Sequence, residues 1–197
     1  DDTVVALLRT LEQAGLEDDT VVMFMSDNGT SFPMAKTNCY MNSTRTPWIV
    51  SWPSGGQAGA VDETHMVSGV DLMPTVLELA GASSPKPMDG RSIVPLLRGQ
   101  NQPNRDQVFT QFYHIHGEHP YPMFAVQGRR FGYIFNPWSN GQRKYTAEPL
   151  SGLSYQAMKR AAADDPKIAA RLRKLHYRTV EEFYDYRTPN TSPESYS

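Results

Sequence analysis

The apolar run Thr20-Val21-Val22-Met23-Phe24-Met25, followed directly by Ser26-Asp27-Asn28-Gly29, gives the first indication of the fold. A continuous apolar run without alternation is typical of a strand buried on both faces, as in a parallel sheet covered by helices. In open α/β sheets, ligands bind at the carboxyl ends of the strands, because strand ends and helix N-termini meet there. The stretch therefore predicts an α/β fold with polar chemistry at residues 26–29.

Apolar patterns on either side of this strand predict further elements of an α/β core. Apolar residues at helical spacing precede the strand and end at Gly15, and residues 48–52 form a second short apolar run. Residues 70–81 show the clearest helical pattern, and residues 92–97 show a shorter one. Helices and strands in this order indicate the α/β class.

The second half of the chain has a different character. Its patterns predict antiparallel strands at 107–113, 123–127 and 130–136, a helical stretch over 155–177 broken at Asp165-Pro166, and an edge strand at 182–186. We therefore expect three parts. Residues 1–104 belong to an α/β core domain, residues 105–187 form an antiparallel subdomain, and residues 188–197 are a disordered tail.

Composition excludes several classes of protein. The 197 residues are 39% hydrophobic and 20% charged, values typical of a globular protein with a core. A formal net charge of −2 offers no electrostatic footprint for nucleic acid or an anionic membrane. No apolar stretch approaches the length of a membrane helix. The single cysteine, Cys39, excludes an internal disulfide framework.

The N-terminus has neither the basic segment nor the apolar segment of a signal peptide. It starts directly within the amphipathic helical pattern. We therefore expect this chain to be a piece of a longer protein.

The polar residues after the first strand suggest a metal site. Asp27 and Asn28 offer a carboxylate and an amide oxygen, and such hard donors suit Ca²⁺ or Mg²⁺. Gly29 allows the backbone to turn sharply and to approach a ligand closely. The alternative is a plain turn, because Asn-Gly is a favoured turn sequence.

Lys36 lies nine positions after Asp27. A lysine near a metal held by oxygen ligands is useful when the substrate is a tetrahedral oxyanion, because lysine supplies a point charge and the metal neutralises the rest. The alternative is an ordinary solvated surface lysine.

The order of several short motifs resembles the sulfatase family. The motifs are Ser26-Asp27-Asn28-Gly29, Lys36, Arg45-Thr46-Pro47-Trp48, Val70-Asp71-Leu72-Met73-Pro74-Thr75, Met88-Asp89-Gly90-Arg91-Ser92 and Glu181-Glu182-Phe183-Tyr184-Asp185. Phe32-Pro33 and Tyr121-Pro122-Met123 look most like the sulfamidase branch of that family and its bacterial members. The resemblance covers the chain up to about residue 187 and fits the C-terminal portion of a sulfatase.

This resemblance implies the C-terminal part of an alkaline-phosphatase-like α/β fold, with a small C-terminal subdomain of antiparallel sheet and helix. It implies that Asp27 and Asn28 are two ligands of one calcium ion, and that Asp27 also has a catalytic role. It implies that Lys36 is catalytic and contacts the sulfate group of the substrate. The remaining calcium ligands are expected outside this chain.

The family's nucleophile is a formylglycine made from Cys or Ser in a C-x-P/A-x-R motif, which this chain lacks. Cys39 is followed by Tyr40-Met41-Asn42-Ser43, so we expect a buried structural thiol there. The nucleophile is therefore expected upstream, and this chain alone is expected to be inactive.

Histidines cluster in Phe112-Tyr113-His114-Ile115-His116-Gly117-Glu118-His119. On a strand, His114 and His116 share one face, so a transition-metal site is one possibility and plain surface histidines are another. The resemblance favours substrate binding by His114 and His116. We interpret His65 and His176 as structural.

The resemblance implies hydrolysis of a sulfate ester or sulfamate on a sulfated sugar such as a glycosaminoglycan, outside the cytoplasm. The net charge and the lack of a long apolar stretch predict no nucleic-acid partner and no membrane insertion. Two alternatives stay open: a phosphonate or phosphodiester hydrolase of the same superfamily, and a non-catalytic module that binds calcium or glycan.

Overall fold

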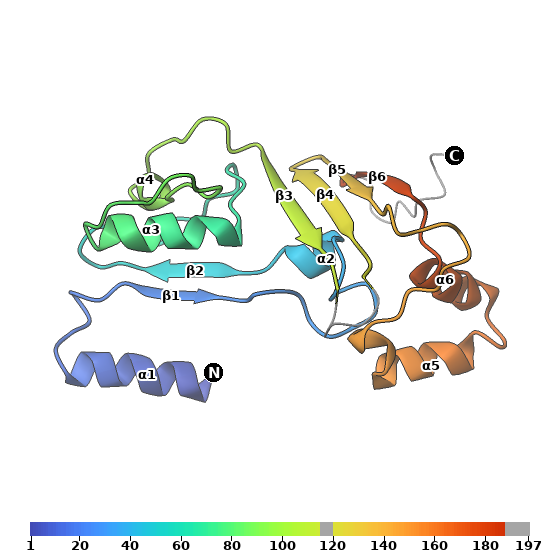
Figure 1. Ribbon diagram of the computed structural model, residues 1–197. Helices are drawn as coiled ribbons and strands as arrows, with labels where there is room; N and C mark the ends of the chain where they lie inside the picture. The colour runs from blue at the N-terminus through green and yellow to red at the C-terminus, as the bar shows by residue number, and fades with distance from the viewer. Residues whose placement is uncertain (115–119, 188–197) are drawn as a thin grey trace. The chain divides into compact units, whose positions relative to one another are not determined.

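The computed structural model describes residues 1–114 and 120–187 (Figure 1). The chain divides into two compact units. The first consists of Asp1–Ser26 and Pro47–Arg105, and the second consists of Asp27–Thr46 and the chain from Asp106 onward. The domain boundaries expected from the sequence stay a prediction, and the expected tail at 188–197 lies outside the described residues.

The first unit contains the helices and strands expected of its sequence. They are α1 (Asp2–Gln13), β1 (Val22–Met25), β2 (Trp48–Ser51), η1 (Gly69–Asp71), α3 (Leu72–Leu79) and α4 (Val94–Leu97). Helix α1 is followed by Gly15 at φ 64°, and α3 is followed by Gly81 at φ 66°. A positive φ is unstrained for glycine, so both glycines end their helices as expected.

The pairing of β1 differs from the expectation of a parallel, doubly covered strand. Strands β1 and β2 are antiparallel, with Phe24 opposite Ile49. These two residues are 50% and 61% exposed. The described residues supply only these two strands to this sheet, and the face that carries Phe24 and Ile49 is exposed. The prediction of burial on both faces is therefore wrong for this chain.

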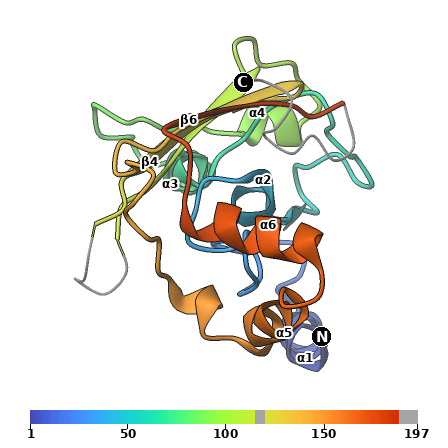
Figure 2. The same cartoon turned by 90° about the vertical axis from the view of Figure 1, so that its right-hand side faces the viewer.

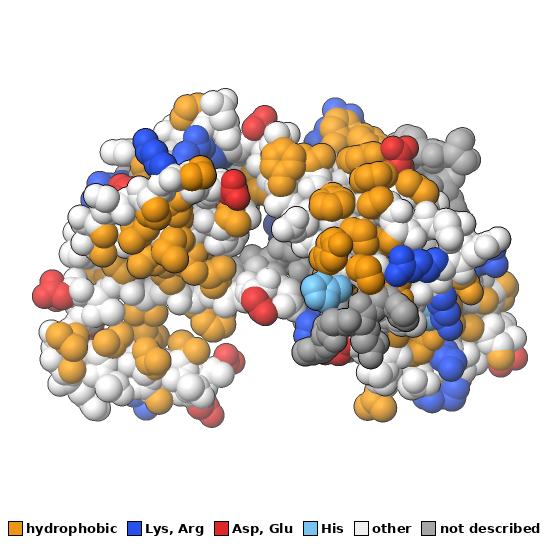
Figure 3. Space-filling view, in the orientation of Figure 1, with side chains coloured by type: hydrophobic (Ala, Val, Ile, Leu, Met, Phe, Trp, Pro, Cys, Tyr) orange, Lys and Arg blue, Asp and Glu red, His pale blue; other side chains and the backbone are white. Residues whose placement is uncertain are grey.

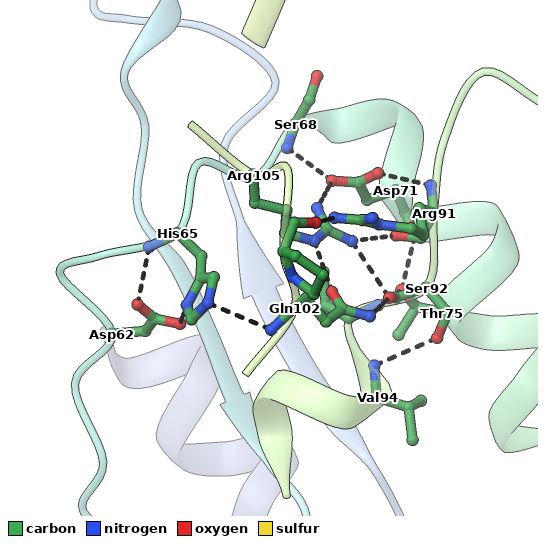
Figure 4. A network of polar contacts seen from close by, with 12 residues as sticks. Asp62, His65, Ser68, Asp71, Thr75, Arg91, Ser92, Val94, Gln102 and Arg105 are labelled. Atoms are coloured by element: carbon green, nitrogen blue, oxygen red, sulfur yellow. Dashed lines mark hydrogen bonds and ion pairs between the residues drawn. The ribbon is translucent and has the colours of Figure 1, made fainter. Parts of the chain in front are cut away.

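A buried ion pair holds α3 against the segment that follows α4 (Figure 4). Arg105 donates to Asp71 at 2.7 Å, and the two residues are only 7% and 5% exposed. The other Asp71 oxygen accepts the Arg91 N–H at 2.7 Å, and Arg105 also donates to the Arg91 carbonyl at 2.6 Å. A buried charge is tolerated when it is paired and hydrogen-bonded, as both charges are here.

His65 is structural, as expected. Its Nδ1 lies 2.7 Å from Asp62 Oδ2, and its Nε2 lies 2.7 Å from Asn101 Oδ1. These hydrogen bonds hold the loop before η1 against the loop after α4 (Figure 4).

The second unit contains a four-stranded sheet in the order β3-β4-β5-β6, in which every neighbouring pair is antiparallel. The strands are β3 (Gln107–Phe112), β4 (Met123–Gly128), β5 (Phe131–Phe135) and β6 (Glu181–Asp185). The expected strands, the β4–β5 hairpin turn and the edge position of the last strand are all confirmed. The remaining elements are α2 (Met41–Thr44), η2 (Glu148–Leu150), α5 (Leu153–Ala161) and α6 (Pro166–His176).

Helices α5 and α6 pack together, with the expected break between them (Figure 2). Asp165 caps α6 by accepting the Lys167 N–H at 2.8 Å, and Pro166 occupies the first helical position, where no N–H is needed. His176 at the end of α6 lies 2.9 Å from Tyr155 Oη and 3.1 Å from the Tyr145 carbonyl oxygen. It is buried and structural, as expected.

The two faces of the four-stranded sheet differ. One face covers a core that consists of Cys39, Tyr121, Met123, Ala125, Ile134, Trp138 and Tyr145. The opposite face carries exposed phenylalanines from all four strands, namely Phe109, Phe124, Phe131, Phe135 and Phe183. Hydrophobic side chains also gather over α3 in the first unit (Figure 3). Among the described residues, no helix is long and apolar enough to span a bilayer.

Candidate functional site

Asp27 and Asn28 follow β1 along the chain and open the segment 27–46 of the second unit. Asp27 is exposed, Asn28 is half-buried, and the Asn28 N–H donates to Asp27 Oδ1 at 3.0 Å. This contact turns the carboxylate back over the backbone of the next residue. The pair therefore lies at an accessible turn rather than inside the core.

Gly29 brings two parts of this segment together. Its N–H donates to the Ser43 carbonyl at 2.9 Å. A Cβ at position 29 would overlap the carbonyl oxygens of Ala35 and Asn42. Only glycine permits such a close backbone approach. The residue after Asn28 thus lies against the residue before Lys36.

The backbone on both sides of Lys36 adopts a rare conformation. Met34 has φ 68° and Thr37 has φ 61°, and left-handed values are uncommon for residues other than glycine. The Lys36 carbonyl accepts from Thr37 Oγ1 at 2.6 Å and from Asn38 Nδ2 at 2.7 Å. Such conformations persist where the surroundings hold them and cluster at functional sites.

The loop of residues 30–38, called the Lys36 loop below, is anchored to the core of the second unit. Tyr145 Oη donates to the Thr37 carbonyl, and burial raises the pKa of Tyr145 to about 12, so this phenol stays protonated and able to donate. Gln127 on β4 donates to the Cys39 carbonyl at 2.8 Å and accepts from Thr44 at 2.9 Å. The segment around Lys36 is therefore held on the buried face of the sheet.

The Lys36 ammonium has a carboxylate partner that our sequence analysis missed. Lys36 Nζ lies 2.9 Å from Glu148 Oε2, and Ser31 Oγ donates to Glu148 Oε1 at 2.8 Å. Glu148 lies in η2, 112 residues after Lys36. Glu148 belongs to no motif or periodic pattern that we recognised, so the sequence alone does not indicate its contact with Lys36.

Cys39 is a structural thiol, as expected. It is 1% exposed, and its Sγ lies 3.7 Å from the Met123 carbonyl oxygen. Burial raises the pKa of Cys39 to about 11, so the reactive thiolate form is disfavoured.

Of the two predicted histidines, only His114 lies among the described residues, and none of its described contacts reaches Lys36. His114 is exposed, and its ring stands edge-on to that of Tyr113 at 5.6 Å between centroids. No hydrogen bond joins His114 to Lys36 or Asp27 within residues 1–114 and 120–187. His116 lies outside the described residues.

Asp27 and Asn28 fit part of a hard-cation site. They supply one carboxylate and one amide oxygen, the donor types that calcium prefers, on an accessible turn. Within the described part of the chain, no three or more His, Cys, Asp or Glu side chains cluster as a metal site. Calcium takes six to eight oxygen ligands, so a complete site here needs ligands beyond those described.

Comparison with known proteins identifies the family. Residues 33–140, which include Lys36 and most of its loop, match the family described as N-sulphoglucosamine sulphohydrolase, C-terminal. The chain belongs to this sulfatase family. Human N-sulphoglucosamine sulphohydrolase is 33% identical over 94% of this chain and 39% of its own length.

Solved structures of a putative sulfatase and of a phosphonate monoester hydrolase share the fold. A putative sulfatase from Bacteroides thetaiotaomicron is 25% identical, with a TM-score of 0.62 over 87% of this chain and 37% of its own chain. A phosphonate monoester hydrolase from Silicibacter pomeroyi has a TM-score of 0.58 at 22% identity, over 86% of this chain and 38% of its own. The expected fold, the C-terminal part of an alkaline-phosphatase-like sulfatase, is therefore confirmed. The chain spans about two fifths of the length of these relatives.

Proposed function

We propose that the complete protein is a calcium-dependent sulfatase that hydrolyses a sulfamate or sulfate ester on a glucosamine-type sugar. The observation that carries this proposal is the Gly29 turn, which brings the Asp27–Asn28 pair toward the Lys36 loop in a chain of the sulphohydrolase family. A carboxylate, an amide oxygen and an ammonium group on one loop suit a metal-bound, doubly charged oxyanion.

In this proposal, Lys36 contacts the oxygens of the sulfate group. A fixed ammonium beside the non-bridging oxygens stabilises negative charge that develops on them during hydrolysis. The anchored backbone at Lys36 and Thr37 supports this role, because a positioned charge needs no reorganisation during the reaction.

Asp27 and Asn28 hold the calcium ion in this proposal. When bound, the ion supplies charge neutralisation to the sulfate oxygens. Asp27 contributes a negative ligand, whereas Asn28 contributes a neutral one, so the pair leaves net positive charge on the cation for the substrate. We also assign Asp27 a catalytic role beside its ligand role.

The nucleophile in this proposal is a formylglycine outside the present chain, as the family resemblance implies. The burial of Cys39, whose thiolate is disfavoured, argues against that residue as the nucleophile. His114 and His116 contact the sugar. The exposure of His114 supports this assignment, since a substrate-binding imidazole must be accessible.

The test is hydrolysis by the complete protein, measured as the inorganic sulfate released by ion chromatography. N-sulfated glucosamine, a 6-O-sulfated glucosamine and a phosphonate monoester are compared, with and without a calcium chelator. We expect sulfate release from a sulfated sugar that falls by about 100-fold or more in Lys36→Met and after chelation.

Two outcomes would replace the proposal. Turnover of the phosphonate monoester alone would assign the activity of the phosphonate hydrolases that share this fold. Binding of calcium and sulfated sugar without turnover, measured by calorimetry, would indicate a non-catalytic module.

A further inference from the structure

One carboxylate joins the two ends of the segment from Ser31 to Lys36. Glu148 Oε1 accepts from Ser31 Oγ at 2.8 Å, and Glu148 Oε2 accepts from Lys36 Nζ at 2.9 Å. The carboxylate thus holds both the Ser31 hydroxyl and the ammonium assigned above to the sulfate group. The two contacts define the direction of the Lys36 side chain.

Glu148 is itself rigidly placed. It begins η2, where the buried Pro149 follows it and the Ser151 hydroxyl donates to its carbonyl at 2.8 Å. The flanking Ala147 and Leu150 pack against the core of the second unit. The carboxylate therefore projects from a fixed point of the backbone, which suits an anchor for a flexible lysine.

The exposure of this ion pair makes a mainly structural purpose a poor explanation. The Lys36 and Glu148 side chains are 29% and 48% exposed. Ion pairs that are this accessible to water contribute little to folding. Lysine, however, has high side-chain entropy, and a partner that restricts its rotamers reduces the entropy lost when a ligand binds.

We propose that Glu148 is a positioning residue that orients the Lys36 ammonium for the sulfate group before substrate binds. This inference rests on the proposed function, because it requires Lys36 to act on an anionic substrate. Glu148 acts through Lys36, so its effect on catalysis depends on the presence of the lysine. Glu148 also accepts a hydrogen bond from the Ser31 hydroxyl, so one carboxylate contacts both Ser31 and Lys36.

The test is a double-mutant cycle in the complete protein, with kcat and KM measured on the sulfated sugar that the wild type hydrolyses. The variants are Glu148→Ala, Glu148→Gln, Lys36→Met and the double variant Glu148→Ala with Lys36→Met. The matched control is Glu181→Ala, because Glu181 is an exposed acid of the same unit that accepts from Tyr133 Oη at 2.8 Å.

We expect Glu148→Ala to lower kcat/KM by about tenfold and to have no further effect when Lys36 is already Met. Glu148→Gln should retain most of the activity, because its amide oxygen still accepts from the lysine. Glu181→Ala should match the wild type. The thermal unfolding midpoint of Glu148→Ala should stay close to that of the wild type.

Three results would overturn the inference while leaving the proposed function intact. They are wild-type activity in Glu148→Ala, an equal loss from Glu148→Ala in the presence and absence of Lys36, and a loss matched by Glu181→Ala. Failure of the proposed function has a different signature, since the wild type would then release no sulfate or Lys36→Met would be fully active. Either of those results would overturn both proposals.

Discussion

The α-carbon of Gly29 lies against the carbonyl oxygen of Ala35, with no room for a Cβ between them. Since Asn28 precedes Gly29 and Lys36 follows Ala35, this contact links the acid–amide pair to the lysine through the backbone. The arrangement does not depend on any side-chain interaction between them. The proposed site is therefore built on a glycine that contributes no functional group.

Substitution of Gly29 should damage both folding and activity. The Cβ of Gly29→Ala would overlap the Ala35 and Asn42 carbonyl oxygens, so one side of the loop must move. We expect a loss of about 1–3 kcal/mol in the free energy of unfolding, together with a fall in sulfate release. Gly69→Ala is the control, because a Cβ there meets no atom within 4 Å. Equal behaviour of the two variants would contradict the close approach.

Removal of Asp71 should strongly destabilise the first unit. Asp71→Ala leaves the Arg105 guanidinium buried without its ionic partner, which costs about 3–5 kcal/mol in the free energy of unfolding. Asp89→Ala serves as the control, since Asp89 is an exposed acid of the same unit. Denaturant unfolding of the complete protein checks this, and a midpoint equal to that of the control would refute a buried pair.

His176 should make the second unit sensitive to mild acid. Burial lowers the pKa of His176 below its usual 6.5 more than the Tyr145 carbonyl raises it. The unfolded chain then binds more protons than the folded one just below pH 6.5, so the stabilisation by neutral His176 is lost as pH falls. The unfolding free energy of wild type minus that of His176→Asn should therefore shrink between about pH 7.5 and about pH 5.

The opposite sign is expected at His65. Hydrogen bonds to Asn101 and Asp62 raise the pKa of His65, so its contribution is present at low pH and is lost as pH rises through the raised value. The difference between wild type and His65→Asn should shrink with rising pH. A difference that is independent of pH for either histidine would show that its pKa is unshifted by folding.

Asp27→Ala should abolish turnover without unfolding the protein. Asp27 is exposed, and its hydrogen bond with Asn28 is local, so little folding energy depends on it. We expect a loss of about 100-fold or more in kcat/KM together with an unchanged circular dichroism spectrum. Activity near that of the wild type would remove Asp27 from the site.

Regular elements could be predicted because their signals are local. The helical pattern over 70–81 corresponds to η1 and α3, and the Asp165-Pro166 break separates α5 from α6. Capping residues and periodicity act within a few positions, so one sequence suffices to read them.

The environment of β1 could not be read in the same way. Its apolar run correctly predicted a strand, but the partner of a strand and the layers around it are set by distant segments. The same limit applies to segment 27–46, which joins the second unit through Tyr145 and Gln127. The side chains involved are more than 80 residues away in sequence.

The candidate site could likewise be predicted only in part from the sequence. Asp27, Asn28 and Lys36 became candidates because their residue types lie within ten positions and their order resembles a sulfatase motif. Glu148 was missed because only the folded sheet and η2 bring it to Lys36.

The central claim is that Asp27 and Asn28 hold calcium for an oxyanion that Lys36 contacts. The most direct measurement is a crystal structure of the complete protein with calcium and inorganic sulfate. We predict side-chain oxygens of Asp27 and Asn28 at about 2.3–2.6 Å from the ion. We also predict the Lys36 ammonium within hydrogen-bond distance of a sulfate oxygen. A calcium ion bound elsewhere, with both side chains directed into solvent, would contradict the claim.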